Sequence, residues 1–167
     1  FCTDRSCTRK NCECGFFAGG TSQLRRMLDP TRGFVDPDSV AYIVLEPIQG
    51  EGGYNIPSDE FMREVAAVSA EHDILLVADE IQSGLGRTGE FWAADHYPIE
   101  PDVVAAAKGL RVGATIGNED VFPAERSRLS STWGGGDLLA VAQGAITMDV
   151  IQEQDLMTNA TARGRQF

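Results

Sequence analysis

Short runs of apolar residues, each bounded by glycine, proline or charged residues, are the clearest pattern in this sequence. The runs cover residues 41–45, 74–78 and 103–107. A continuous apolar run of this length is typical of a strand that is buried on both faces of its sheet. We therefore predict three buried strands in the middle of the chain.

Helical spacing of apolar residues occurs between and after these runs. Residues 58–72 place Phe61, Val65 and Val68 on one face, and Ser58 is a suitable N-cap. Further helical patterns, most of them short, cover residues 22–28, 91–96 and 138–154. Strands that alternate with helices indicate an α/β fold, in which right-handed crossovers give a mostly parallel sheet flanked by helices.

A charged residue follows each predicted strand, namely Glu46, Asp79 and Lys108. Because the carboxyl ends of parallel strands lie at the edge where α/β proteins bind ligands, we expect these side chains to gather there. A buried carboxylate needs a cationic partner, and burial favours the neutral, nucleophilic form of a lysine amine. Asp79 and Lys108 therefore fit Schiff-base chemistry, while a structural ion pair or two solvated strand ends fit the same spacing.

Residues 74–80 also resemble the strand of nucleotide triphosphatases that carries a magnesium-binding acid. Such an enzyme needs a phosphate-binding G-x-x-x-x-G-K-[ST] loop. Neither Lys10 nor Lys108 lies in such a pattern. The sequence therefore favours the lysine-based interpretation over the triphosphatase.

The charge balance excludes some classes of partner. The chain has 14 basic and 25 acidic residues, a net charge of −11, which argues against nucleic acids and anionic membranes. No apolar run approaches the ~18 residues of a transmembrane helix. The first ten residues are polar and do not resemble a signal peptide. We expect a soluble, cytoplasmic protein.

Lysine is scarce, since Lys10 and Lys108 are the only two among the 14 basic residues. An acidic surface that is poor in lysine suits concentrated salt, where charge repulsion is screened. We hypothesise a salt-adapted (halophilic) enzyme, with an ordinary acidic enzyme as the alternative. The scarcity also implies a function for the lysine that follows an apolar strand.

All four cysteines, Cys2, Cys7, Cys12 and Cys14, lie in the first fourteen residues. Their spacing lacks the C-x2-C pairs of common zinc sites, and no histidine is near. We expect reduced thiols in an irregular segment, residues 1–38, and no metal. A metal or cluster site is the less favoured alternative.

Four stretches of the sequence resemble one protein family. Asp79-Glu-Ile-Gln-Ser-Gly-Leu-Gly-Arg-Thr-Gly89 and Pro101-Asp-Val-Val-Ala-Ala-Ala-Lys-Gly-Leu110 resemble the signature of class III, or ω-amino-acid, aminotransferases. Glu46-Pro-Ile-Gln-Gly-Glu-Gly-Gly53 resembles an upstream motif, and Ser131-Thr-Trp-Gly-Gly135 resembles a downstream one. The order and separation of all four agree with this family, whose members use pyridoxal 5′-phosphate (PLP) and share the fold-type I large domain.

The resemblance implies a role for each of five residues. Lys108 would form a Schiff base with PLP and then move a proton between substrate and cofactor. Asp79 would pair with the pyridine nitrogen, which makes the ring an electron sink. Ile81 would pack on the ring face, and Gln82 would lie near the ring hydroxyl. Thr132 would reach the cofactor phosphate of a neighbouring subunit, so the implied active unit is a homodimer with its cofactor site at the interface.

The resemblance also implies a reaction. Glu51 would correspond to the glutamate that pairs with a gating arginine, so that one pocket accepts an ω-amino acid and a dicarboxylate. We expect transfer of an amino group from an ω-amino acid, with 4-aminobutyrate as the preferred donor, to 2-oxoglutarate. The sequence departs from the family pattern at Gly109-Leu-Arg-Val-Gly113 and at Gly136-Asp137. Glu46 lines the same region without an assigned role.

Length sets the expected domain organisation. Residues 39–167 correspond to the central part of the PLP-binding large domain, which is therefore incomplete. The N-terminal segment and the C-terminal domain of full-length relatives have no counterpart in these 167 residues. Two alternatives stay open: an aminomutase or racemase of the same fold, and a truncated fragment without catalytic activity.

Overall fold

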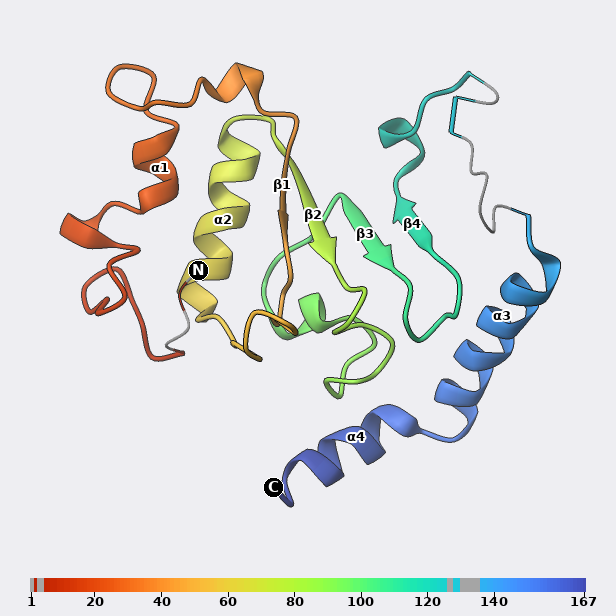
Figure 1. The fold of residues 1–167 in the computed structure, drawn as a ribbon. Coiled ribbons are helices and arrows are strands. Elements are labelled where there is room, and N and C mark those ends of the chain that lie inside the picture. Colours follow the sequence, from red (N-terminus) through yellow and green to blue (C-terminus); the bar gives the residue numbers. More distant parts are fainter. Residues whose placement is uncertain (1, 3–4, 126–127, 130–135) are drawn as a thin grey trace.

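The computed structural model describes residues 2, 5–125, 128–129 and 136–167. Within these residues, four strands form one sheet in the order β1-β2-β3-β4 (Figure 1). The first three are mutually parallel and the fourth is antiparallel to β3. Their bounds are β1 Tyr42–Leu45, β2 Leu75–Asp79, β3 Val103–Ala106 and β4 Ala114–Gly117. The predicted mostly parallel α/β sheet is confirmed.

Helices occupy the four predicted positions, and further helices occur elsewhere in the described residues. The α-helices are α1 Gln23–Met27, α2 Asp59–Glu71, α3 Leu138–Glu153 and α4 Leu156–Gly164, and the short 3-10 helices are Ala18–Gly20, Pro37–Ser39, Ala93–His96 and Glu119–Val121. The strand β4, the helix α4 and all of the 3-10 helices except Ala93–His96 were not predicted. In the part of the chain that the structure describes, no helix has the length and apolar character needed to cross a membrane.

The main core lies between α2 and the sheet. Ser58 caps α2 as predicted, because its hydroxyl accepts a hydrogen bond from the Phe61 N–H at 3.2 Å. The apolar face of α2 contributes buried Phe61, Met62 and Val65, and β2 contributes Leu76. In Figure 1, α1 and α2 lie near β1, α3 lies beyond β4, and α4 runs back below the lower ends of the strands.

The prediction that the strands are buried on both faces is wrong for β1. Ile43 and Leu45 pack against the core clusters, but Tyr42 and Val44 are 58% and 54% exposed. Alternate residues of a strand point to opposite faces. Among the described residues, therefore, only one face of β1 is covered.

A buried carboxylate joins the N-terminal segment to α2. Glu64 is 1% exposed, and its oxygens accept hydrogen bonds from the guanidinium groups of Arg9 and Arg25, the latter at 2.8 Å. Arg25 also donates to Glu71, and this hydrogen bond holds the pKa of the Glu71 carboxyl below its ordinary value. Two cations around one buried anion meet its need for compensation.

Candidate active site

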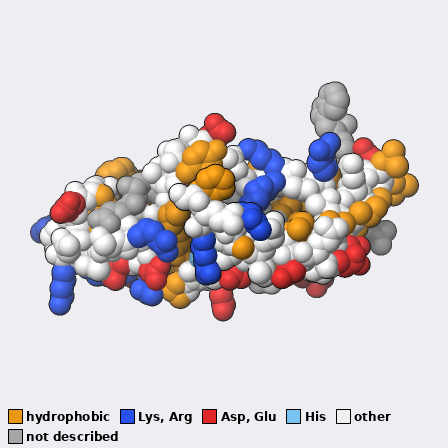
Figure 2. Space-filling view, turned by 90° about the horizontal axis from the view of Figure 1, so that it is seen from below, with side chains coloured by type: hydrophobic (Ala, Val, Ile, Leu, Met, Phe, Trp, Pro, Cys, Tyr) orange, Lys and Arg blue, Asp and Glu red, His pale blue; other side chains and the backbone are white. Residues whose placement is uncertain are grey.

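Parallel pairing brings the carboxyl ends of β1, β2 and β3 to one edge of the sheet. Leu45 pairs with Ala78 and Asp79 pairs with Ala105, so the strands end at nearly the same level. Figure 2 shows this edge from below, with Lys and Arg side chains gathered over the middle of the face beside hydrophobic groups. The charged residues that follow or end these strands are Glu46, Asp79 and Lys108.

A cavity of 460 Å³ opens at this edge, between the turn after β1 and the turn after β2. Lys108, Gln82, Tyr54 and Arg87 are among its lining residues. The Lys108 amine donates a hydrogen bond to Gln82 Oε1 at 2.6 Å. This volume lies within the roughly 300–1,000 Å³ range of small-molecule sites, and the exposed amine stands at its wall.

The turn after β1 is built to receive the Gln82 side chain. A Cβ on Gly50 would lie 2.4 Å from the Gln82 Cδ, so only glycine fits without displacing it. Glu46 Oε2 accepts a hydrogen bond from the Gly50 N–H at 2.8 Å. Glu46, which had no assigned role, therefore fixes the turn that holds the partner of Lys108.

The turn after β2 is held by Arg87 and Glu80. The Arg87 guanidinium donates to the backbone carbonyls of Gln82 and Gly84 at 3.2 and 3.1 Å. The buried Glu80 carboxylate accepts from the Ser83 hydroxyl and the Ala94 N–H, both at 2.7 Å. These bonds shape the loop and leave Glu80 with a structural role.

Asp79 lies at the same edge but lines a different hollow from Lys108. Its carboxylate accepts a hydrogen bond from the Ile81 N–H at 3.1 Å and borders a space of 300 Å³ together with Glu46 and Gln49. Gln49 also lines the Lys108 cavity, so the two hollows adjoin. Among the described residues, Asp79 and Lys108 form no ion pair. The structure therefore does not support the alternative in which these two residues form a structural ion pair.

The other predicted site residues are placed less centrally. Ile81 is half-buried in the turn after β2, and Glu51 is exposed in the turn after β1 and does not line the Lys108 cavity. Thr132 lies outside the described residues. Sequence reasoning did not select Tyr54, which follows the glycine-rich turn and has a left-handed backbone with φ of 55°. An aromatic residue directly after that turn was the available signal.

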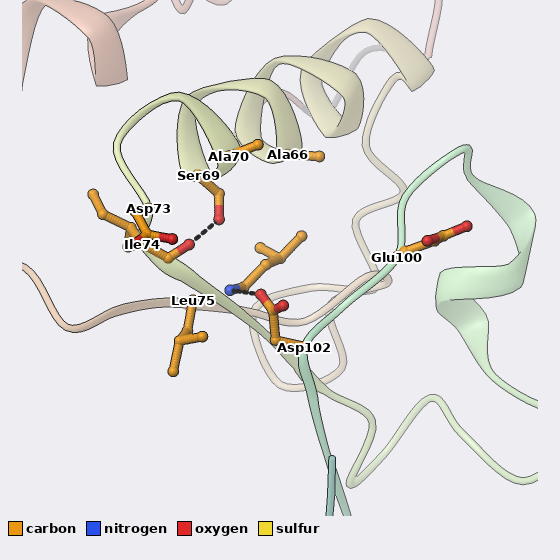
Figure 3. A pocket seen from close by; sticks show the side chains of 9 residues that line it. Ala66, Ser69, Ala70, Asp73, Ile74, Leu75, Glu100 and Asp102 are labelled. Atoms are coloured by element: carbon orange, nitrogen blue, oxygen red, sulfur yellow. Dashed lines mark hydrogen bonds between the residues drawn. The ribbon is translucent and has the colours of Figure 1, made fainter. Parts of the chain in front are cut away.

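A smaller hollow of 180 Å³ lies at the opposite end of β2, against α2 (Figure 3). Asp102 Oδ2 accepts a hydrogen bond from the Leu76 N–H at 2.7 Å, and the Ser69 hydroxyl donates to the Ile74 carbonyl. Both side chains bind backbone groups at the start of β2, which gives them a structural role.

The four cysteines form a second group of reactive side chains. That they lie close together was not predicted from the sequence. The Sγ atoms of the four cysteines all lie within 4.8 Å of one another. The signal available in the sequence was the confinement of every cysteine to fourteen residues, since the spacing itself matches no common zinc pattern.

Several known proteins are similar to this chain in sequence or fold. The acetylornithine aminotransferase of Methanopyrus kandleri is 45% identical over 121 residues, which are 70% of this chain and 31% of that protein. The ornithine aminotransferase of Toxoplasma gondii superposes with a TM-score of 0.72 at 36% identity, over 78% of this chain and 32% of that one. That structure has PLP at partial occupancy in its active site.

A third similar structure is the lysine aminotransferase of M. tuberculosis, with a TM-score of 0.66 and 36% identity over 74% of this chain and 29% of that one. The chain thus spans about a third of the length of these relatives. The family model for class III aminotransferases matches residues 20–167, and the cofactor indicated by this family is PLP. The chain belongs to the class III aminotransferase family.

Proposed function

We propose that Lys108 binds PLP covalently and that the protein transfers an amino group from an ω-amino donor to a 2-oxo acid. The observation that carries this proposal is the exposed Lys108 amine on the wall of the 460 Å³ cavity, 2.6 Å from Gln82 Oε1. The family match over residues 20–167 supports it.

The side chains at this edge suit PLP. PLP carries an aldehyde, a ring hydroxyl and a ring nitrogen. The Lys108 amine would bond the aldehyde, the Gln82 amide would lie near the hydroxyl, and the Asp79 carboxylate would pair with the nitrogen. The lack of a side chain at Gly50 leaves room for the Gln82 amide beside the amine. Lys108 makes no ion pair with any described residue, so its amine is not committed to a structural role.

When bound, PLP supplies an electron sink for the electrons of a broken substrate bond. Lys108 Nζ removes and returns the proton at the substrate carbon as a general acid–base. Gln82 orients Nζ through its hydrogen bond. Asp79 keeps the ring nitrogen protonated, because a nearby carboxylate favours the charged form of a cationic partner. Ile81 offers an apolar contact to the ring.

The donor class follows from the relatives. Their names specify acetylornithine, ornithine and lysine, each of which has an amino group at the far end of its side chain. We propose these as donors beside 4-aminobutyrate, with 2-oxoglutarate as acceptor. Glu51 would act through a gating arginine with which it pairs, so that the pocket accepts the second carboxylate. Thr132 reaches the phosphate bound by the partner in a homodimer.

The direct test uses the scarcity of lysine. PLP is added to the protein expressed from its complete reading frame, the bond is fixed with borohydride, and the modified peptide is identified by mass spectrometry. We expect visible absorbance and labelling at Lys108. Both should vanish in Lys108→Ala and persist in Lys10→Ala, the matched control at the other lysine of the chain. Labelling elsewhere, or none, contradicts the proposal and favours a fragment without activity.

A donor screen on the same preparation separates the remaining alternatives. Formation of glutamate from 2-oxoglutarate with an ω-amino donor supports transamination. Movement of the amino group within one substrate, or inversion of its configuration, would identify a mutase or racemase.

We also infer a cytoplasmic, salt-adapted protein from its net charge of −11 and its two lysines. Added salt screens repulsion among the acidic groups. The midpoint of thermal unfolding should therefore rise between low and molar potassium chloride. A midpoint that falls over this range contradicts salt adaptation.

A further inference from the structure

The N-terminal segment brings its four thiols together although they are spread over thirteen positions. Cys2, Cys7, Cys12 and Cys14 have every Sγ within 4.8 Å of the others. Cys2 and Cys7 are 0% and 2% exposed, while Cys14 is exposed. The cluster is therefore closed on the side of the protein, with Cys12 half-buried and Cys14 exposed to solvent.

The distances fit a tetrahedral ion better than disulfides. A zinc–sulfur bond of about 2.3 Å places the sulfurs of a tetrahedral site about 3.8 Å apart. A disulfide needs about 2.05 Å, whereas Cys14 lies 3.1 Å from Cys2 and 3.2 Å from Cys12. Cys14 approaches both neighbours equally, so the arrangement selects no disulfide pair.

The backbone around the cysteines supports such a site. Thr8 and Asn11 exchange two backbone hydrogen bonds of 3.1 Å and close the turn between Cys7 and Cys12. Gly15, with a φ of +79°, lets the chain reverse after the last cysteine. The Phe17 N–H then donates to Cys12 Sγ at 3.4 Å, the kind of outer hydrogen bond that orients a metal ligand.

We propose that Cys2, Cys7, Cys12 and Cys14 bind one structural zinc ion. Binding releases the four thiol protons to solvent and forms four zinc–thiolate bonds. Four protein ligands complete a tetrahedral shell and leave no position for a substrate, so the ion has a structural role. Thiolates that bind an iron–sulfur cluster surround several iron atoms and would lie farther apart than these.

The ion would fix this segment onto the catalytic domain. Cys2 and Cys7 belong to the same core cluster as Phe61 of α2 and Leu76 of β2. Arg9, between two of the ligands, pairs with the buried Glu64 and lies 5.6 Å above the Phe17 ring. The site lies outside residues 20–167, the part that the family model matches, and its existence does not depend on the proposed reaction.

The test measures zinc in the protein expressed from its complete reading frame, purified from zinc-supplemented medium. We expect one zinc ion per chain by elemental analysis, and cobalt substitution should give the spectrum of a tetrahedral tetrathiolate. Cys14→Ser removes the exposed ligand without opening the core. It should weaken zinc binding at least about tenfold in competition with a chromogenic chelator, because loss of a ligand exceeds the 10–100-fold effect of an outer-shell change.

Glu13→Gln is the matched control, since Glu13 is exposed and lies between two ligands. It should keep both stoichiometry and affinity. Chelation should lower the unfolding midpoint of the wild type and of Glu13→Gln but not that of Cys14→Ser. Absence of zinc, stoichiometric iron, disulfides in the purified protein, or unchanged affinity in Cys14→Ser would each overturn the site. If Cys14→Ser does not fold, the cobalt spectrum of the wild type decides.

Discussion

The hollows at the two ends of β2 differ in how their polar groups are used. At the amino end, Asp102 accepts from the Leu76 N–H, and Ser69 donates to the Ile74 carbonyl. At the carboxyl end, the exposed Lys108 amine has a neutral amide as its partner, and its cavity is larger, at 460 Å³ against 180 Å³. Polar groups that satisfy each other hold a fold together, whereas an accessible amine beside an open cavity is available for chemistry.

The largest effect should come from the amine itself. Lys108→Ala should lower the rate of amino transfer by roughly 10²–10⁴-fold, the range for a positioned general acid–base. Its stability should stay within about 0.5 kcal/mol of the wild type, because the side chain is exposed. Steady-state kinetics and urea unfolding measure the two quantities. A large loss of stability would show that Lys108 is a structural residue, like those at the amino end.

A crowded turn should have the next largest effect. Gly50→Ala places a Cβ 2.4 Å from the end of the Gln82 side chain, which must move to make room for it. We expect PLP affinity to fall by up to about tenfold as Gln82 moves away from Lys108, as measured by absorbance titration. Gly113→Ala is the control, because a Cβ there meets nothing within 4 Å.

A substitution at the amino end of β2 should lower the stability of the protein and leave its affinity for PLP unchanged. Asp102→Ala leaves the Leu76 N–H without its carboxylate partner, which costs about 1–2 kcal/mol of stability. The midpoint of urea unfolding should fall while PLP affinity stays unchanged. A loss of affinity with unchanged stability would mean that the two ends are not functionally distinct.

The smallest effect should come from the neutral partner of the lysine. Gln82→Ala removes one hydrogen bond of 2.6 Å, worth about 0.5–1.5 kcal/mol. PLP affinity should fall about two- to tenfold, with the unfolding midpoint unchanged. An effect as large as that of Lys108→Ala would give Gln82 a direct part in the reaction.

Much of the sheet could be predicted because apolar runs are a local signal. The runs at 41–45, 74–78 and 103–107 coincide with β1, β2 and β3 to within a residue or two. The strand β4 was missed because its residues, Ala114–Gly117, are mostly exposed and show no apolar run. The prediction that both faces of β1 are buried was wrong, because the elements that pack on a strand can be distant from it in the sequence.

The position of the candidate site residues in the fold was predictable in part. The apolar runs predicted that Glu46, Asp79 and Lys108 lie at the ends of strands, and the family motif indicated Gln82. The contacts that position Gln82 were not predictable, since the Gly50 backbone and the Arg87 guanidinium meet it only after the turns have folded. The convergence of four irregularly spaced cysteines likewise depends on turns rather than on spacing.

The uncovered face of β1 has a practical consequence. Tyr42 and Val44 are more than half exposed, and β1 is the outermost strand in the described sheet order. An exposed edge strand with apolar side chains pairs readily with strands of other molecules. Preparations of these 167 residues will therefore tend to aggregate as their concentration rises, and a charged residue in place of Val44 should keep them dispersed.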